Sequence, residues 1–381
     1  MRTEILIIGG GVIGLCIAYK LRLAGTRRIA IVERGTFGSE ASWAAGGMLG
    51  VQAETDSPGN FLDLCRASLS LYPEFIENLT AATDIDAELD RTGTLKLVFN
   101  EIEAAKLQER AEWQRRAGLA VEQLTATEIR KAEPFISPNV AAGLFFPDDW
   151  QVDNRKLLAA LRRFAETSDI DILENTEAGS IIVENGRAVG VQTQTGEIHA
   201  DHIVLATGAW TSLIKLGDEP MPLNVKPIRG QMLEFHTAKR LFRHVLIGPE
   251  GYLVPRADGR LIAGSTTEDV GFDSSNTPQG EAAVLSMAVE LSPSIAGLNV
   301  NNKWAGLRPM AADGMPVIGT IPGVDDMTVA TAHYRNGILL APITAEIAAG
   351  QILNEEASPW MTIFGTERLR FSQQVSTTRA F

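Results

Sequence analysis

The sequence predicts an α/β protein, α+β overall, in which a Rossmann-like domain is interleaved with a domain built on an antiparallel sheet. Three observations support this prediction. A continuous apolar run at residues 4–8 leads through three glycines into an amphipathic segment. Residues 179–208 alternate apolar and polar positions around two turn signals. Several further strand-like segments, separated by turn residues, follow residue 218.

The first 33 residues predict a βαβ unit. Residues 4–8, EILII, form a continuous apolar run after Glu4, as in a parallel strand buried on both faces. In the next stretch, VIGLCIAYKLRLAG, apolar residues recur at spacings of three and four, which indicates a helix, and Gly25 is a suitable C-terminal stop. The segment IAIVE, which ends at Glu33, supplies the second strand.

Residues 179–208 predict a three-stranded meander with turns at Asn185-Gly186 and Thr195-Gly196. Its last strand, HIVLATGAW, ends in small residues around Thr207 and Gly208, which permit a close backbone approach. We therefore expect the chain to return here to the domain that it began.

A chain of 381 residues exceeds the size at which one core keeps growing, so two domains are expected. Residues 92–99 predict a strand and residues 101–117 a helix, while KPIRGQMLEF, HVLIGPEGYLVPR and GRLIAGSTTE predict antiparallel hairpins with a turn at residues 257–259. We assign 1–85, 151–218 and 302–365 to the Rossmann-like domain, 86–150 and 219–301 to the second domain, and 366–381 to a C-terminal tail.

Composition excludes several classes of protein. The net charge of −13 disfavours nucleic acid as a partner. No window reaches the ~18 unbroken apolar residues that span a bilayer, and the N-terminus does not read as a signal peptide, so we expect a cytoplasmic protein without a membrane segment. The two cysteines, Cys16 and Cys65, predict packing rather than a metal site, and we expect no metal.

Gly9, Gly11 and Gly14 form a G-x-G-x-x-G turn between the first strand and its helix. Glu33 follows Gly14 by 19 residues, where its carboxylate can accept hydrogen bonds from a ribose 2′-hydroxyl and would repel a 2′-phosphate. The motif therefore predicts a dinucleotide other than NADP, against the simpler reading of a tight turn. It does not separate FAD from NAD.

Further motifs carry a resemblance. The segments IIGGGVIG, VER, ASWAAGGML, VLATGAW, YLVPR, GSTTE, WAGLRP and HYRNGILLAP together resemble the glycine oxidases of the D-amino-acid oxidase superfamily of flavoproteins, over nearly the whole chain. The resemblance implies a FAD-binding domain of glutathione-reductase type and a substrate-binding domain with an antiparallel sheet. FAD should be non-covalent, because the chain has no cysteine beyond Cys65 to which a flavin could be attached as in related sarcosine oxidases.

The motifs and the resemblance together give the expected cofactor-binding residues: Gly9, Gly11, Val12, Ile13, Gly14, Glu33, Arg34, Ala41, Ser42, Gly46, Gly47, Met48, Ala178, Thr207, Gly208, His333, Tyr334, Arg335, Asn336, Gly337, Ile338 and Leu339. The amides of residues 333–339 should face the flavin carbonyl at which negative charge grows on reduction. A capped helix start in the core is the alternative for this segment.

Arg308 is the expected substrate anchor, because a planar guanidinium can hold a carboxylate through two parallel hydrogen bonds. The alternative is a structural ion pair with an acidic residue of the chain. By resemblance, Tyr252 closes over the substrate carboxylate, and the main-chain carbonyl of Arg335 receives the substrate amine. A core tyrosine and a solvated arginine are the respective alternatives.

Three positions depart from the pattern of glycine oxidases: Glu250 stands for a histidine, Thr267 for a methionine and Arg229 for a lysine. Met48 and Thr267 are expected at the substrate, and a pocket narrowed by Met48 would favour small amines.

The resemblance implies FAD-dependent oxidative deamination of glycine, sarcosine and small D-amino acids to the imine and then the 2-oxo acid, with dioxygen reduced to hydrogen peroxide. It also implies a role in forming the thiazole of thiamine and a homo-oligomer, suspected to be a tetramer. A D-amino-acid dehydrogenase that passes electrons to a quinone or carrier, and a partner-dependent flavoprotein subunit without oxidase activity, are the alternatives.

Overall fold

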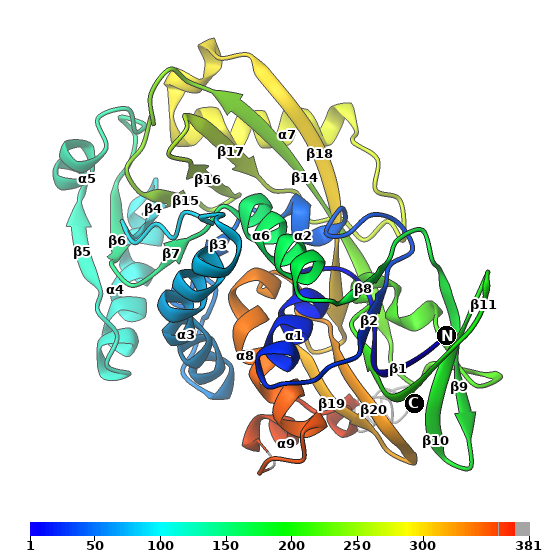
Figure 1. Ribbon diagram of the computed structural model, residues 1–381. Helices are drawn as coiled ribbons and strands as arrows, with labels where there is room; N and C mark the ends of the chain where they lie inside the picture. The colour runs from blue at the N-terminus through cyan, green and yellow to red at the C-terminus, as the bar shows by residue number, and fades with distance from the viewer. Residues whose placement is uncertain (357, 370–381) are drawn as a thin grey trace, which may run out of the picture.

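The computed structural model describes residues 1–356 and 358–369, and it contains two large sheets (Figure 1). The larger sheet has ten strands in the order β13-β12-β9-β10-β20-β11-β1-β2-β8, with β19 paired to β20. Its strands are β1 (Arg2–Ile8), β2 (Ile29–Val32), β8 (Asp171–Leu173), β9 (Ala178–Glu184), β10 (Arg187–Thr193), β11 (Gly196–Leu205), β12 (Lys215–Leu216), β13 (Glu219–Pro220), β19 (Val317–Ile321) and β20 (Val324–Thr331).

The second sheet has eight strands in the order β18-β14-β17-β16-β15-β4-β6-β5. They are β4 (Thr94–Val98), β5 (Glu122–Thr125), β6 (Ala142–Phe146), β14 (Val225–His236), β15 (Val245–Ile247), β16 (Tyr252–Pro255), β17 (Arg260–Gly264) and β18 (Val300–Ala311). A short pair, β3 (Met48–Leu49) and β7 (Trp150–Gln151), lies apart from both sheets. The expected domain boundary at 301/302 falls inside β18, which runs along β14 as a strand of this sheet.

The helices are α1 (Val12–Leu23), α2 (Ala41–Ala44), α3 (Asn60–Thr83), α4 (Glu101–Arg116), α5 (Ala126–Ala132), α6 (Asn154–Thr167), α7 (Pro278–Leu291), α8 (Gly337–Ile352) and α9 (Pro359–Phe364). Two 3₁₀ turns, η1 (Gly208–Leu213) and η2 (Pro293–Gly297), complete the described elements. Of the predicted tail, residues 370–381 lie outside the described part of the chain. No helix among the described residues is long and apolar enough to cross a membrane.

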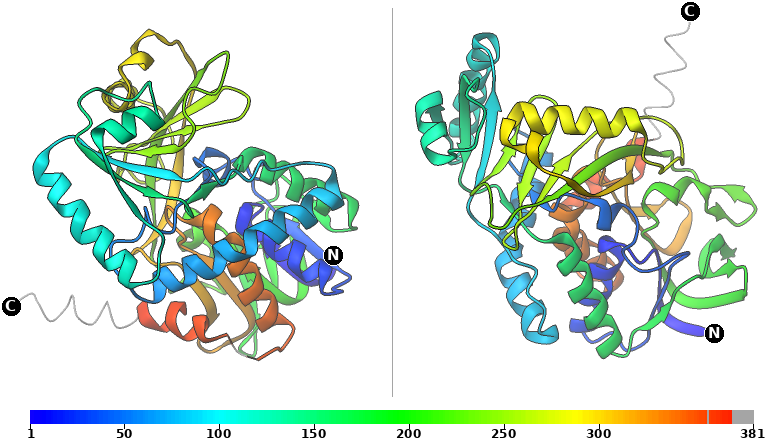
Figure 2. Two further views of the ribbon diagram at one scale, coloured as in Figure 1. Left: turned by 90° about the vertical axis from the view of Figure 1, so that its left-hand side faces the viewer. Right: turned by 90° about the horizontal axis from the view of Figure 1, so that it is seen from above.

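Helices α1, α3, α6 and α8 share one hydrophobic core with the strands β1 and β2, on one face of the ten-stranded sheet (Figure 1). Alternate residues of the same strands, such as Leu6 and Ile8 of β1, pack on the opposite face against β9–β11. This alternation explains why residues 5–8 of EILII are all apolar: both faces of this part of the strand are buried. Helix α7 covers the outer face of the eight-stranded sheet (Figure 2).

The predicted elements near the N-terminus are confirmed. Helix α1 ends in a Schellman motif, in which the amide of Gly25 donates to the carbonyl of Arg22 and the amide of Thr26 to that of Leu21. Gly25 adopts a φ of +95°, which is why glycine suits this position. The predicted meander is also found as β9–β11, and β11 then pairs in parallel with β1.

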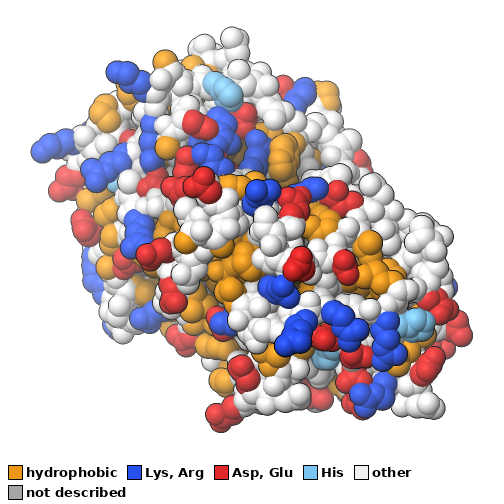
Figure 3. Space-filling model, in the orientation of Figure 1, with side chains coloured by type: hydrophobic (Ala, Val, Ile, Leu, Met, Phe, Trp, Pro, Cys, Tyr) orange, Lys and Arg blue, Asp and Glu red, His pale blue; other side chains and the backbone are white. Residues whose placement is uncertain are grey.

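Basic and acidic side chains are interspersed over the face shown in Figure 3, with apolar atoms exposed between them. The net charge of −13 therefore does not make this face uniformly acidic.

Candidate functional site

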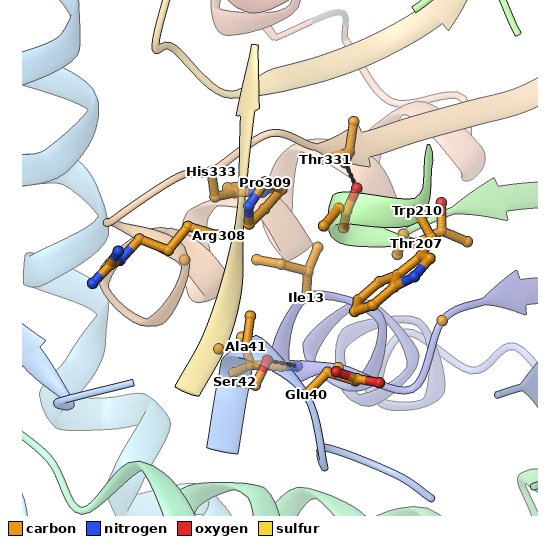
Figure 4. A pocket seen from close by; sticks show the side chains of 18 of the residues that line it. Ile13, Glu40, Ala41, Ser42, Thr207, Trp210, Arg308, Pro309, Thr331 and His333 are labelled. Atoms are coloured by element: carbon orange, nitrogen blue, oxygen red, sulfur yellow. Dashed lines mark hydrogen bonds between the residues drawn. The ribbon is translucent and has the colours of Figure 1, made fainter. Parts of the chain in front are cut away.

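A cavity lies where the amino end of α1, the amino end of α8 and the eight-stranded sheet meet. Figure 4 shows it as an elongated site: Arg308 of β18 lies at one end, Glu40 and Trp210 lie at the other, and Ile13, Pro309 and His333 lie between them. The cavity therefore brings together residues that are more than 300 positions apart in the sequence.

The glycine-rich turn is sterically specified. Gly9 has a φ of +110°, and a Cβ at this position would lie 2.3 Å from the carbonyl oxygen of Ala206 at the end of β11. A Cβ at Gly14 would lie 2.0 Å from the carbonyl oxygen of Gly9. Glycine at both positions therefore lets β1, α1 and β11 approach closely.

The amino end of α1 is left open for a ligand. Its N-cap, Gly11, provides no capping side chain, and Ser42 Oγ accepts a hydrogen bond from the Val12 amide at 3.0 Å. Ile13 also lines the cavity. First-turn amides without intrahelical partners, together with the helix dipole, form an anion site of the kind that binds a pyrophosphate.

Glu33 lines the same cavity from the carboxyl end of β2. Its carboxylate accepts hydrogen bonds from the amides of Gly10 and Gly35, each at 2.9 Å, which fixes its orientation. Each carboxylate oxygen retains a further lone pair, so Glu33 can still accept a hydrogen bond from a ribose hydroxyl.

Two residues near this end were not assigned from the sequence. The guanidinium of Arg34 lies 3.7 Å from the ring centroid of Trp210 and forms an ion pair with Glu40. Both Trp210 and Glu40 line the cavity. The signal for Trp210 was its place directly after the small residues of VLATGAW, where a flat side chain can lie beside an adenosine.

Helix α2 and the residues after it, 42–47, line the cavity, and side chains from elsewhere in the fold hold several of their carbonyl groups. Asn154 donates to the carbonyls of Ser42 and Trp43, and Trp304 donates to that of Ala44 at 3.0 Å. The buried Arg256 donates to the carbonyl of Gly46 at 2.9 Å. This arrangement explains the Ala- and Gly-rich composition and supports contact between the backbone and a flat ligand.

The amino end of α8 also faces the cavity without a side-chain cap. Pro342 lies inside this helix and cannot donate to the carbonyl of Ile338. The hydroxyl of Tyr72 on α3 donates to that carbonyl instead. Ser68 of α3 donates to the next carbonyl, that of Leu339, at 2.6 Å. Helix α3 thereby holds the first turn of α8 against the cavity.

His333 precedes this turn and lines the cavity. Its Nε2 lies 2.9 Å from Thr344 Oγ1, and burial lowers the pKa of its imidazole to about 3. His333 is therefore neutral at ordinary pH, and it adds no positive charge to that of the helix end.

Arg308 has no carboxylate partner among the described residues. Its guanidinium donates to Ser265 Oγ at 2.5 Å and to the carbonyl of Thr266 at 3.2 Å, both of which are neutral acceptors. Its neighbour Arg229 is paired instead with Glu268 and Asp273. The structural ion pair considered for Arg308 is thus not formed, and its positive charge is available to a ligand.

Tyr252 is buried in the wall of the cavity, and its hydroxyl has only one weak partner in the described structure, Met232 Sδ at 3.5 Å. A Cβ added to Gly46 would lie 3.4 Å from this hydroxyl, so the loop containing residues 42–47 runs directly beside it. The hydroxyl is free to donate to a ligand held by Arg308.

The Arg335 side chain is not simply solvated. It forms two hydrogen bonds with Glu54, at 2.9 and 3.1 Å, and this carboxylate raises the pKa of Arg335 against the opposing effect of burial. Glu54 was not predicted, because only the fold brings it to Arg335 from 281 positions away.

A second cavity adjoins the first one, and four residues line both of them: Glu54, Tyr252, Tyr334 and Arg335. These four side chains therefore form the partition between the inner site and an outer vestibule. Thr267, expected at the substrate, is exposed and lines only the vestibule.

Most residues expected from the sequence line the inner cavity. Gly14 and Leu339 lie behind it: Gly14 packs against β1, and Leu339 belongs to the core shared with α3. Asn336, the N-cap of α8, lines the vestibule instead. The other expected residues lining the cavity are Gly9, Gly11, Val12, Ile13, Glu33, Arg34, Ala41, Ser42, Gly46, Gly47, Met48, Ala178, Thr207, Gly208, Tyr252, Arg308, His333, Tyr334, Arg335, Gly337 and Ile338.

Comparison with known proteins agrees with this geometry. Residues 4–351 match the model of the DAO family, described as FAD dependent oxidoreductase. The chain is 35% identical to the glycine oxidase of Bacillus licheniformis over 96% of its own length and 98% of that protein. The crystal structure of the glycine oxidase from Geobacillus kaustophilus superposes with a TM-score of 0.91 at 33% identity, covering 96% of this chain and 99% of that one.

A longer relative is the bifunctional protein ThiO/ThiG of Synechocystis sp., which is 39% identical over 96% of this chain. The chain spans 54% of that protein, so it corresponds to about half of the relative's length.

The residues present fit FAD. Two open helix ends, the oriented carboxylate of Glu33 and a flat backbone surface are arranged along one cavity. They supply the pyrophosphate site, the ribose acceptor and the flavin-facing amides that an extended dinucleotide requires.

Proposed function

This chain belongs to the family of FAD-dependent oxidoreductases, and on that premise we propose that it oxidises the amine of glycine and of other small amino acids. The observation that carries this proposal is the guanidinium of Arg308, which has no carboxylate partner in the described part of the chain and lines the inner cavity with Tyr252. A substrate carboxylate is the anion that matches this pair, since arginine holds carboxylates through two parallel hydrogen bonds.

When bound, FAD would accept a hydride from the carbon that carries the amine and would pass the electrons to dioxygen, giving hydrogen peroxide. The protein's own contribution is positioning. Arg308 and Tyr252 would hold the carboxylate, the carbonyl of Arg335 would accept a hydrogen bond from the amine, and Met48 would limit the room for a side chain. Water then hydrolyses the imine product to the 2-oxo acid, which is glyoxylate for glycine.

The amides at the amino end of α8 would stabilise the negative charge that develops on the cofactor during reduction, because they are fixed donors at the positive end of a helix. His333 would not add to this stabilisation, because burial lowers the pKa of its imidazole to about 3 and the ring is therefore neutral.

The test is reduction of the purified yellow holoenzyme under anaerobic conditions by glycine, sarcosine and D-alanine, followed by peroxide measurement in air. Bleaching by at least one amine, with stoichiometric peroxide on reoxidation, is the expected result. Bleaching without peroxide formation in air would indicate a dehydrogenase with another acceptor. Failure of every amine to bleach the flavin would overturn the proposal and favour a flavoprotein subunit.

The ThiO/ThiG relative suggests where the product is used. We propose that the imine formed from glycine feeds thiazole formation for thiamine. Growth of a thiamine-requiring strain that lacks its own source of this imine should be restored by the active protein and not by the Arg308→Ala variant.

A further inference from the structure

Lys96 is a cation without a partner in the wall of the vestibule. It lies on β4, is half-buried, and forms no ion pair or side-chain hydrogen bond with the described residues. Burial lowers the pKa of its ammonium group, as expected for a charge removed from water without a counter-ion. A lysine held in this way is available to an anion from outside the protein.

Sheet register places Lys96 in line with the substrate end of the inner cavity. Lys96 pairs with Ile247 of β15, and Ile247 pairs with Tyr252 of β16. Directly paired residues project from the same face of a sheet, so Lys96 and Tyr252 share one face. Their backbones are two strand spacings apart, or about 10 Å.

The packing of the neighbouring side chains confirms that Lys96 and Tyr252 lie on the same face of the sheet. Leu95 and Leu97, on either side of Lys96, pack in the core beneath α7. Ile247 and Tyr252 instead pack with Trp304 and with Ala44 of α2, on the face that covers the inner cavity. Lys96 therefore projects toward the region that a substrate would enter from the vestibule.

The charged groups around Lys96 include more cations than carboxylates, and Lys96 is the cation that has no carboxylate partner among the described residues. Arg110 pairs with Asp56 at 2.8 Å, and Arg335 pairs with Glu54 at 2.9 Å. These four groups act most strongly on Lys96 after burial itself. Three cations thus face two carboxylates, and each carboxylate already has an arginine partner.

The other carboxylates of the vestibule do not remove this surplus. Asp313 is paired with Arg368, while Glu250 and Glu290 are exposed and form no ion pair within the described residues. Water screens such exposed groups, whereas Lys96 is partly withdrawn from solvent.

We propose that Lys96 forms, in the inner wall of the vestibule, a binding site for a second anionic group, so that the enzyme accepts amino acids whose amine bears a further carboxylate. This inference rests on the proposed function for the position of the first carboxylate at Arg308 and Tyr252. The amine then lies between the two sites, and an N-carboxyalkyl chain extends past the partition toward Lys96.

The binding test uses two ligands that contain no amine and therefore cannot be oxidised in this way. Diglycolate carries two carboxylates, and methoxyacetate is its counterpart with one carboxylate. Each is titrated into the holoenzyme while the visible absorption of the bound flavin is followed. Diglycolate should bind at least about tenfold more tightly than methoxyacetate, because a second charge-assisted contact is made.

Variants separate a binding role from a structural one. Lys96→Met should abolish the preference for diglycolate and leave methoxyacetate binding and glycine turnover nearly unchanged, while Lys96→Arg should retain most of the preference. Lys215→Met, at an exposed lysine on β12, is the control and should behave as the wild type. If Lys96→Met does not fold, Lys96→Gln provides the same comparison.

The catalytic counterpart compares N-(carboxymethyl)glycine with its mono-amide, N-(carbamoylmethyl)glycine, by kcat/KM in the wild type and in Lys96→Met. A preference for the diacid that only the wild type shows would support the site. Equal binding of diglycolate and methoxyacetate by the wild type, or equal weakening of both in Lys96→Met, would overturn it. A diglycolate preference in a protein that oxidises no amine would uphold this site while the proposed function fails.

Discussion

The guanidinium of Arg308 lies directly over Gly230 on the neighbouring strand. A Cβ added to Gly230 would lie 2.1 Å from Nη2 and 2.4 Å from Cζ of Arg308. Arg308 on β18 is paired in register with Ile228 of β14, so its side chain crosses the sheet surface diagonally to reach Gly230. The absence of a side chain at Gly230 is what allows the guanidinium to lie flat against the sheet.

Gly230→Ala should therefore impair substrate capture without unfolding the protein. The atoms that a methyl group would meet are the far end of a flexible side chain, which can move away at little cost in stability. We expect KM for glycine to rise by about tenfold or more, because the displaced guanidinium of Arg308 would lose its contact with the substrate carboxylate. Flavin content and the melting temperature should stay nearly unchanged.

Gly297→Ala is the matched control, because a Cβ at that position would meet no atom within 4 Å. An unchanged KM in Gly230→Ala would show that Arg308 does not hold the substrate in the observed position.

Arg308→Ala and Arg308→Lys test the anchor itself. Removing the guanidinium should weaken substrate capture by about 2 to 5 kcal/mol, the cost of breaking a desolvated charge pair. Arg308→Lys should recover only part of this loss, since an ammonium group cannot form the two parallel hydrogen bonds. Steady-state kinetics with glycine and the flavin absorption spectrum measure both effects. Loss of bound FAD in either variant would indicate a structural role instead.

The βαβ unit, the meander and the hairpins could be predicted because their determinants are local. Apolar periodicity, a glycine at a helix end and turn dipeptides each act over a few residues, and α1 and β9–β11 lie where these patterns indicated. The place of strand β18 in the eight-stranded sheet could not be predicted from local patterns. Its membership of the eight-stranded sheet depends on eleven register pairs with β14, which no local pattern specifies.

The residues of the candidate site also fall into two groups: those that local sequence motifs predict and those that only the fold brings together. Gly9, Glu33 and Arg308 occur in motifs whose chemistry can be read from neighbouring residues. Glu54 could not be found in this manner, since its importance comes from an ion pair with Arg335 that only tertiary folding creates. The role of Tyr72 was hidden for the same reason: it follows from the carbonyl of Ile338, which Pro342 leaves without a donor.

His202 on β11 should make an unfavourable contribution to stability in mild acid. Its Nε2 lies 2.8 Å from Thr328 Oγ1, and burial lowers the pKa of its imidazole to about 4. An unfolded histidine has a pKa of about 6.5, so between pH 6.5 and 4 the unfolded state binds more protons. The contribution of His202 to the free energy of unfolding should therefore fall as pH falls through this window, by up to about 1.4 kcal/mol per pH unit.

Urea unfolding of the wild type and of His202→Gln between pH 4 and 8 measures this contribution. The variant should show a shallower decline below pH 6.5. His199→Gln, at a half-buried position of the same strand, is the matched control. Parallel pH profiles for the wild type and His202→Gln would contradict the assignment.

Replacing a buried tyrosine by phenylalanine should lower the free energy of unfolding at Tyr72 and raise KM for glycine at Tyr252. Tyr72 donates to the carbonyl of Ile338, which has no helical donor because of Pro342, so Tyr72→Phe leaves a buried acceptor unsatisfied. The expected cost is about 1 to 3 kcal/mol in the free energy of unfolding. Among the described residues, the Tyr252 hydroxyl has one partner, the thioether of Met232, which is a weak acceptor, so Tyr252→Phe should change stability by less than about 0.5 kcal/mol. In the function that we propose, its hydroxyl donates to the substrate carboxylate, so KM for glycine should rise by about tenfold or more, as for a lost hydrogen bond to a charged group. Denaturant unfolding and steady-state kinetics on both variants check the pair. A stability loss in Tyr252→Phe with an unchanged KM would place its hydroxyl in the packing of the sheet and leave Arg308 as the sole contact to the carboxylate.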